Sequence, residues 1–366
     1  MKKLFIKLLA ICLVTIVAVS ASGCACGCSG TPALSLTANW FDKNTEQTQT
    51  LTENVSYNVS YLSDWDGLKA TNKEIEVVGL SGTYNITFNS DAKSQFNAET
   101  FGFTAEETEE LNKLREEMLK SKNVDNNANF RIYKYVTALN VTGSYKYKSN
   151  GQVVDFTDSI VTTVYFTNYI DNYKPLYSKK VVATTTPYAS SIDQYQYTVE
   201  TFYKGKKASV TLTPLDEETK EYFVKGNLMK KDAEEKVSTI KKVGSYYDNE
   251  QLIFLMRGME LKKKANITVP IVDTTGLRKN KVAIKVTADA ETVKIENFNG
   301  QPETEISCFK TTISLSNGNY SGASKTAYFS ASADYQTYHN ILVQYVDALP
   351  HNVGALQYTL ASYART

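Results

Sequence analysis

The chain has 366 residues, with 40 Lys and Arg against 39 Asp and Glu, and 42% of its residues are hydrophobic. This length fits one large or two ordinary domains, and the apolar content excludes a disordered chain. The net charge of +1 at pH 7 excludes the basic surface of a nucleic-acid-binding protein.

Residues 1–23 have the organisation of a secretory signal peptide. Three basic residues, Lys2, Lys3 and Lys7, precede an apolar run from Leu8 to Val19, and small residues follow it. The apolar run is 12 residues long, whereas a helix that spans a bilayer needs about 20. We therefore expect residues 1–23 to be removed on export, which would leave 37 basic against 39 acidic residues.

The signal peptide ends in Ala21-Ser22-Gly23-Cys24, which resembles the lipobox of bacterial lipoproteins. The resemblance implies cleavage before Cys24, a diacylglycerol thioether on its sulfur, and an amide-linked acyl chain such as palmitate on the new N-terminus. Several acyl chains anchor a protein to a membrane far better than one. The family prefers Leu where Ala21 stands, and an ordinary secretory signal with an incidental cysteine is the alternative.

The remaining cysteines predict no disulfide framework. Ala25-Cys26-Gly27-Cys28 also fits the lipobox pattern, so a shifted register would modify Cys28, and Cys26 is a further candidate. Otherwise Cys26 and Cys28 form a local disulfide or stay unpaired, because their spacing lacks the C-x₂-C geometry of a metal knuckle. Cys308 is expected to be a small buried thiol in a strand, so stability must come from a packed core.

Beyond the lipidation site, we expect a tether over residues 24–47 and a β-rich domain over residues 48–366, with a possible subdivision near 170–190 or 215–245. Apolar and polar residues alternate repeatedly in this domain, which is typical of strands with one buried face. Tyr and Val occupy the apolar positions in Val55, Tyr57, Val59 and Tyr61. Strands are predicted over residues 54–62, 131–148, 154–166, 195–203, 210–212, 267–272, 282–286, 293–295, 306–313, 327–331, 341–345 and 356–363.

Helical patterns are few. Thr104 and Glu107 form a capping box ahead of a stripe of Leu111, Leu114 and Met118. A second helix is predicted over 232–244, with Val237, Ile240 and Val243 facing inward, and a third over 248–257. Tight turns between strands favour antiparallel pairing. We therefore predict a mainly β fold with a few helices, a large antiparallel β-barrel or half-barrel.

The second half contains three segments that together resemble a known family. These are the helix from Asp248 to Leu255-Met256-Arg257, the run Val282-Ala-Ile-Lys-Val286, and a C-terminal hairpin from Ala327 to Leu360. They are similar to an exported bacterial family of unknown function whose barrel is like that of the lipoprotein carriers LolA and LolB. The family usually has Trp where Tyr328 or Phe329 stands. The resemblance implies a fold and a compartment, and it brings no catalytic residues.

No catalytic, metal-binding or cofactor-binding residues are predicted. The chain has no nucleophile elbow, zinc-protease motif, phosphate loop or dinucleotide fingerprint. His339 and His351 are expected to be surface residues. The loop Asp64-Trp65-Asp66-Gly67 fits a hairpin turn better than a sugar-binding loop. Two basic clusters, Lys262–Lys264 and Arg278 with Lys279 and Lys281, either protect strand edges or meet anionic lipids.

Two functions remain open from the sequence. The first is a non-enzymatic lipoprotein, anchored to the cell membrane and facing outside the cytoplasm, whose curved sheet binds an apolar or lipid-like ligand. The second is a structural or interaction lipoprotein that presents loops to cell-wall glycans or to protein partners. An unfilled interior of more than about 300 Å³ would favour the first function, and a filled one the second.

Overall fold

The computed structural model describes residues 51–90, 132–167, 173–187 and 192–366, with gaps at 67, 69–71, 263, 288, 316–323 and 332–338, and single residues between 105 and 116. The predicted signal peptide and tether, with Cys24, Cys26 and Cys28, lie outside the described residues. None of the helices in the described part of the chain is long and apolar enough to cross a membrane.

Sixteen strands form one sheet. In chain order they are β1 (Leu51–Leu62), β2 (Ile75–Ser90), β3 (Ile132–Tyr147), β4 (Val153–Thr167), β5 (Lys174–Pro187), β6 (Ile192–Lys204), β7 (Lys207–Pro214), β8 (Lys236–Lys241), β9 (Tyr247–Asp248), β10 (Asn266–Asp273), β11 (Arg278–Val286), β12 (Glu291–Phe298), β13 (Gln301–Leu315), β14 (Lys325–Ala331), β15 (His339–Ala348) and β16 (Ala355–Arg365). Two helices have described bounds, α4 (Glu217–Lys225) and α5 (Leu252–Arg257), and the 3-10 turns are η3 (Asn249–Gln251) and η4 (Pro350–Asn352).

The sheet consists of two meanders that meet at β1. Strands β1 to β8 follow one another, and β1 also pairs with β16, the last strand of the second meander. This pairing joins the first and last described strands of the chain, where Thr52 and Thr366 exchange backbone hydrogen bonds of 2.7 and 2.9 Å. All strand pairs are antiparallel except β9–β10. The predicted antiparallel β fold is therefore confirmed, but the sheet has free ends at β8 and β9 and is no closed barrel.

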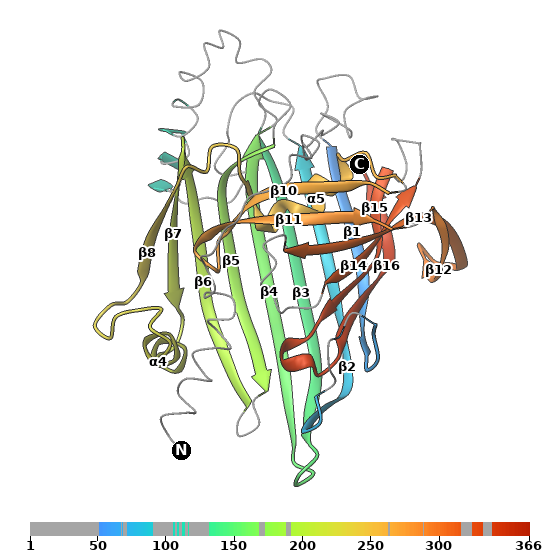
Figure 1. Cartoon of the computed structure of the whole chain (residues 1–366), viewed down its shortest axis with the longest axis horizontal. Coiled ribbons are helices and arrows are strands. Elements are labelled where there is room, and N and C mark those ends of the chain that lie inside the picture. The colour runs from blue at the N-terminus through green and yellow to red at the C-terminus, as the bar shows by residue number, and fades with distance from the viewer. Residues whose placement is uncertain are drawn as a thin grey trace, which may run out of the picture.

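The sheet is bent so that its two halves face each other. Strands β1 to β8 stand side by side as a tall wall, and β10, β11 and β13 cross in front of it (Figure 1). One continuous core contains residues from both walls, including Tyr57 of β1, Phe88 of β2, Ile284 of β11 and Phe329 of β14. The alternation predicted for β1 is confirmed, because Val55, Tyr57 and Val59 are buried while Asn54 and Asn58 are exposed.

The helix predicted over 232–244 is wrong. Residues Lys236–Lys241 form strand β8, in which Ile240 is 7% exposed and Val237 is 58% exposed. The reason is that Val237, Thr239 and Ile240 are β-branched, and such residues favour the pleated sheet over the helix. Ile240 and Val243 do point into a core, but this second cluster packs helix α4 against β6, β7 and β8.

Helix α4 is a feature that the sequence analysis missed. The Asp216 carboxylate caps it by accepting a hydrogen bond of 2.6 Å from the backbone N–H of Thr219, and Gly226 follows its last residue. Acidic residues occupy its first turn and Lys225 its last, which is the favourable arrangement for the helix dipole. These capping signals lie in the sequence and could have identified the helix.

The other two helical predictions agree with the described residues. Those residues between 105 and 116 that the structure describes are helical, whereas Thr104, Glu107, Leu111, Leu114 and Met118 lie outside the described residues. The helix predicted over 248–257 is confirmed as η3 followed by α5.

Candidate functional site

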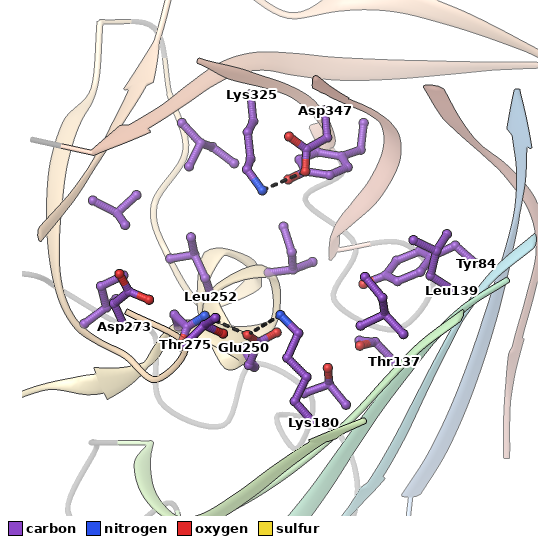
Figure 2. Close-up of a pocket in the computed structure, with 18 of the residues that line it drawn as sticks. Tyr84, Thr137, Leu139, Lys180, Glu250, Leu252, Asp273, Thr275, Lys325 and Asp347 are labelled. Atoms are coloured by element: carbon purple, nitrogen blue, oxygen red, sulfur yellow. Dashed lines mark hydrogen bonds and ion pairs between the residues drawn. The ribbon is translucent and has the colours of Figure 1, made fainter. Parts of the chain in front are cut away.

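A cavity of about 460 Å³ lies between the two walls of the sheet. Strands β2 to β5 supply one side of it, and β10, β11 and β13 to β16 supply the other. Figure 2 shows side chains from both walls and from the α5 region pointing into the same open space. Because the lining residues come from strands far apart in the sequence, the bending of the sheet creates the cavity.

The lining mixes apolar and polar side chains, and apolar atoms supply the larger share of its surface. The apolar side chains that face the cavity are Leu139, Ile160, Leu252, Ile253, Ile271, Val282 and Ile313. Three tyrosines, Tyr84, Tyr345 and Tyr358, add aromatic surface and stand next to one another, with ring centroids 5.2 Å apart in each adjacent pair. Burial raises the pKa of all three phenols above the ordinary value, so their hydroxyls stay protonated and uncharged at neutral pH.

Three ion pairs interrupt this apolar lining. Lys180 Nζ lies 3.0 Å from Glu250 Oε1, and Lys325 Nζ lies 2.7 Å from Asp347 Oδ2 on the opposite side (Figure 2). Arg278 Nε lies 3.3 Å from Asp273 Oδ2. The cavity therefore carries three positive and three negative side chains, and each cation already has an anion of its own.

Both lysines keep their charge in this setting. Burial opposes the charge of Lys325, but Asp347 and Tyr345 outweigh it and raise the pKa of Lys325 well above its ordinary value. Burial likewise opposes the charge of Lys180, and the carboxylate of Glu250 again raises the pKa. A lysine that acts as a base or nucleophile needs a lowered pKa, and these two have the opposite shift.

One end of the cavity is bordered by η3 and α5, which a buried capping box holds in place. Asp248 Oδ1 accepts a hydrogen bond of 2.8 Å from the Glu250 N–H, and Gln251 Oε1 accepts one of 3.1 Å from the Asp248 N–H. Asp248 Oδ2 also accepts a hydrogen bond of 2.6 Å from the Tyr203 hydroxyl on β6. These contacts orient Glu250, Leu252 and Ile253 toward the cavity.

Asp248 should make stability depend on pH. Burial, and then the charge of Glu250, raise the pKa of Asp248 from its ordinary value to about 6. Because the folded pKa exceeds the unfolded one, the stabilising contribution is present below about pH 4 and is lost as the pH rises through 6. Asp248→Asn retains a capping oxygen but carries no titratable group. We expect its free energy of unfolding, relative to that of wild type, to be higher at pH 7.5 than at pH 4 by on the order of 2–3 kcal/mol.

Urea unfolding at the two pH values measures this difference. Asp216→Asn makes the same change at the N-cap of α4, outside the cavity, and is the matched control. Equal effects of Asp248→Asn at pH 4 and pH 7.5 would contradict the assignment.

Several residues singled out in the sequence lie away from the cavity. Cys308 is fully buried in β13, as predicted, and burial raises its pKa to about 12, which makes its thiol unreactive. Asp64 and Asp66 are exposed in the β1–β2 connection, with Trp65 half-buried. His351 lies in η4, and burial lowers its pKa. His339 begins β15, and its side chain lies outside the described part of the chain. His351 is not among the described residues that line the cavity.

The structure separates the members of the two basic clusters. Arg278 lines the cavity, whereas Lys279 and Lys281 are exposed. Lys262 is exposed and pairs with Glu260 at 3.0 Å. The cavity ion pairs are what the sequence analysis missed, because Lys180 and Glu250 are 70 residues apart. Charged residues such as Lys325, at the start of an apolar strand, were the available signal.

The comparisons with known proteins give no family. No protein-family model matches the chain, and no curated protein matches it. Among solved structures, the chain is similar to a β-barrel-like protein of the domain of unknown function DUF1849 from Brucella abortus, with 10% sequence identity and a TM-score of 0.41. The match covers 86% of this chain and 98% of that one.

Proposed function

We propose that this protein is a non-enzymatic lipoprotein of the cell envelope that holds an amphipathic ligand inside a half-barrel. The observation that supports the proposal is the cavity of about 460 Å³ between the walls, with its largely apolar lining. Ligand pockets usually have volumes of roughly 300–1,000 Å³ and combine apolar walls with a few polar groups. A scaffold with a solid core, the second function that the sequence left open, would not need such a space.

Binding would be driven by burial of the ligand's apolar surface. Each Å² of apolar surface removed from water contributes roughly 25 cal/mol, so an acyl chain is a suitable occupant. The tyrosine hydroxyls and the ion pairs would hydrogen-bond the polar end and fix its orientation.

Filling the cavity should abolish ligand binding. Ile160 of β4 lines the cavity, and the next residue, Val161, points to the opposite face and is 39% exposed. We expect the chain from residue 25 onward to carry a copurified or added lipid in native mass spectrometry. Ile160→Trp should reduce the bound fraction at least about tenfold, because the indole occupies the ligand's volume.

Val161→Trp is the matched control, since it places the same ring on the outer face of the same strand. The proposal fails if the wild-type chain takes up no lipid when challenged, or if the two Trp variants bind it equally well.

The membrane anchor is a separate part of the proposal and rests on the lipobox resemblance around Cys24. We expect Cys24→Ala to abolish labelling by a fatty-acid analogue and to release most of the protein from the membrane fraction. Cys308→Ala, at a buried thiol, is the matched control and should leave labelling unchanged. Full membrane retention of Cys24→Ala would contradict the anchor, or would move it to Cys26 or Cys28 if labelling persists.

A further inference from the structure

The cavity is electrically balanced, and this limits the ligands that it can hold. Its lining contains three positively charged residues, Lys180, Arg278 and Lys325, and three negatively charged ones, Glu250, Asp273 and Asp347. Each of the three cations lies within 3.3 Å of a carboxylate. A charged ligand headgroup would therefore have to compete with a side chain for its counter-charge.

The cost of that competition depends on how enclosed the pairs are. The side chains of Lys180 and Glu250 are 20% and 15% exposed, those of Arg278 and Asp273 are 29% and 16% exposed, and those of Lys325 and Asp347 are 45% and 30% exposed. The cost of displacement is therefore largest at Lys180 and Glu250. Displacing one member of an enclosed pair leaves the other charge without compensation, which is strongly unfavourable. A carboxylate ligand that binds one of these cations would leave Glu250, Asp273 or Asp347 without its counter-charge. A cationic ligand that binds one of the carboxylates would likewise leave a lysine or Arg278 without its counter-charge.

The lining also contains a hydrogen-bonding group that is free. The hydroxyl of Thr275 is buried, lines the cavity, and has no hydrogen-bond partner among the residues that the structure describes. Thr275 follows Asp273 by two residues, and Figure 2 shows both at the same side of the cavity. A hydroxyl both donates and accepts, so it suits a ligand hydroxyl or an ester carbonyl.

Building on the proposed function, we propose that the ligand is an uncharged long-chain lipid with hydroxyl or ester groups at its polar end, of the monoacylglycerol type. The acyl chain lies against the apolar strands, and the polar end hydrogen-bonds Thr275 while the three ion pairs stay intact. Fatty acids and fatty amines of the same chain length are excluded by the balanced charge.

The test compares three lipids of equal chain length on the chain from residue 25 onward at pH 7.5. Monopalmitoylglycerol, palmitate and hexadecylamine are titrated separately, and the bound fraction is measured by native mass spectrometry. We expect monopalmitoylglycerol to bind at least about tenfold more tightly than either charged lipid. Equal or tighter binding of palmitate or hexadecylamine would overturn this inference and leave the proposed function standing. Absence of binding by all three would overturn both.

Two variants test the same inference through the protein. Asp347→Asn removes the partner of Lys325, so palmitate should bind about tenfold more tightly, whereas Asp155→Asn at an exposed site on β4 should not change palmitate binding.

Thr275→Val should weaken monopalmitoylglycerol binding about five- to tenfold without affecting palmitate binding. Thr292→Val, at an exposed site on β12, is its control. Unchanged palmitate binding in Asp347→Asn, or unchanged monopalmitoylglycerol binding in Thr275→Val, would contradict the charge-balance argument.

Discussion

Replacing Arg257 with Met should lower the free energy of unfolding by about 3–5 kcal/mol, because it leaves a buried carboxylate without a counter-charge. Arg257 Nη1 lies 2.5 Å from Glu53 Oε2, and the two side chains are 9% and 1% exposed. The hydroxyl of Tyr363 donates a second hydrogen bond of 2.7 Å to Glu53 Oε1. The cluster thus links α5 to β1 and β16, where the two meanders join.

Urea unfolding at pH 7 measures the loss. Lys294→Met is the matched control, because Lys294 pairs with Glu303 and Glu305 on the exposed surface, where solvent screens such pairs and they add little stability. The double variant Glu53→Gln/Arg257→Met removes both charges and should recover a large part of the loss. Similar losses for Arg257→Met and Lys294→Met would contradict the role of the buried pair.

The ion pair between Glu53 and Arg257 also predicts that the protein loses stability as the pH falls. Burial would raise the pKa of Glu53, but Arg257 and Tyr363 outweigh burial and hold it below the ordinary value. The stabilisation is therefore present at neutral pH and is lost as the pH falls below the unfolded value, toward the folded one. Wild type should lose more stability between pH 5 and pH 3 than the double variant does.

Replacing Phe254 with Ala should cost about 3–5 kcal/mol, because it empties the centre of an aromatic cluster. Phe254 of α5 is fully buried. Its ring centroid lies 4.8 Å from those of Phe88 and Phe166, and 5.3 and 5.6 Å from those of Tyr173 and Tyr135. A helix of six residues has little stability of its own, so this packing is what holds α5 at the end of the cavity.

Two further variants distinguish the loss of packing around Phe254 from the effect of removing an aromatic ring elsewhere. Phe254→Leu keeps much of the apolar volume and should cost clearly less than Phe254→Ala. Phe202→Ala removes a half-buried ring that contacts Tyr177, and it should cost about 1 kcal/mol or less. If Phe254→Ala proved no more destabilising than Phe202→Ala, the cluster would not be what holds α5 in place.

The strands that the sequence predicted are those with one buried and one exposed face. The alternation is regular in β1, β3 and β6, so their buried residues could be named in advance. β2 was missed because a register shift between Val78 and Ser81 breaks its period of two. β5 was missed because Pro175, Leu176, Tyr177 and Ser178 are buried in succession, and a strand covered on both faces does not alternate.

The helix over 248–257 was predicted from its run of apolar residues, and the structure adds the capping box at Asp248. The cavity is different, because it exists only where the second meander crosses in front of the first. Nothing in the surroundings of Lys180 in the chain indicates Glu250, and nothing near Thr275 indicates that this residue lines the cavity.

The sequence by itself determined the antiparallel β class, the buried face of the regular strands and the helix over 248–257, because these follow from neighbours within a few residues. The tertiary structure alone decided that the sheet stays open between β8 and β9, that Glu53 and Arg257 meet, and that three ion pairs balance within one cavity. Most of these contacts join residues 22 to 204 positions apart, whereas Arg278 and Asp273 are 5 apart across the turn between β10 and β11. The bending of the sheet brings the distant partners together. Local sequence patterns do not indicate contacts between residues that are far apart in the chain.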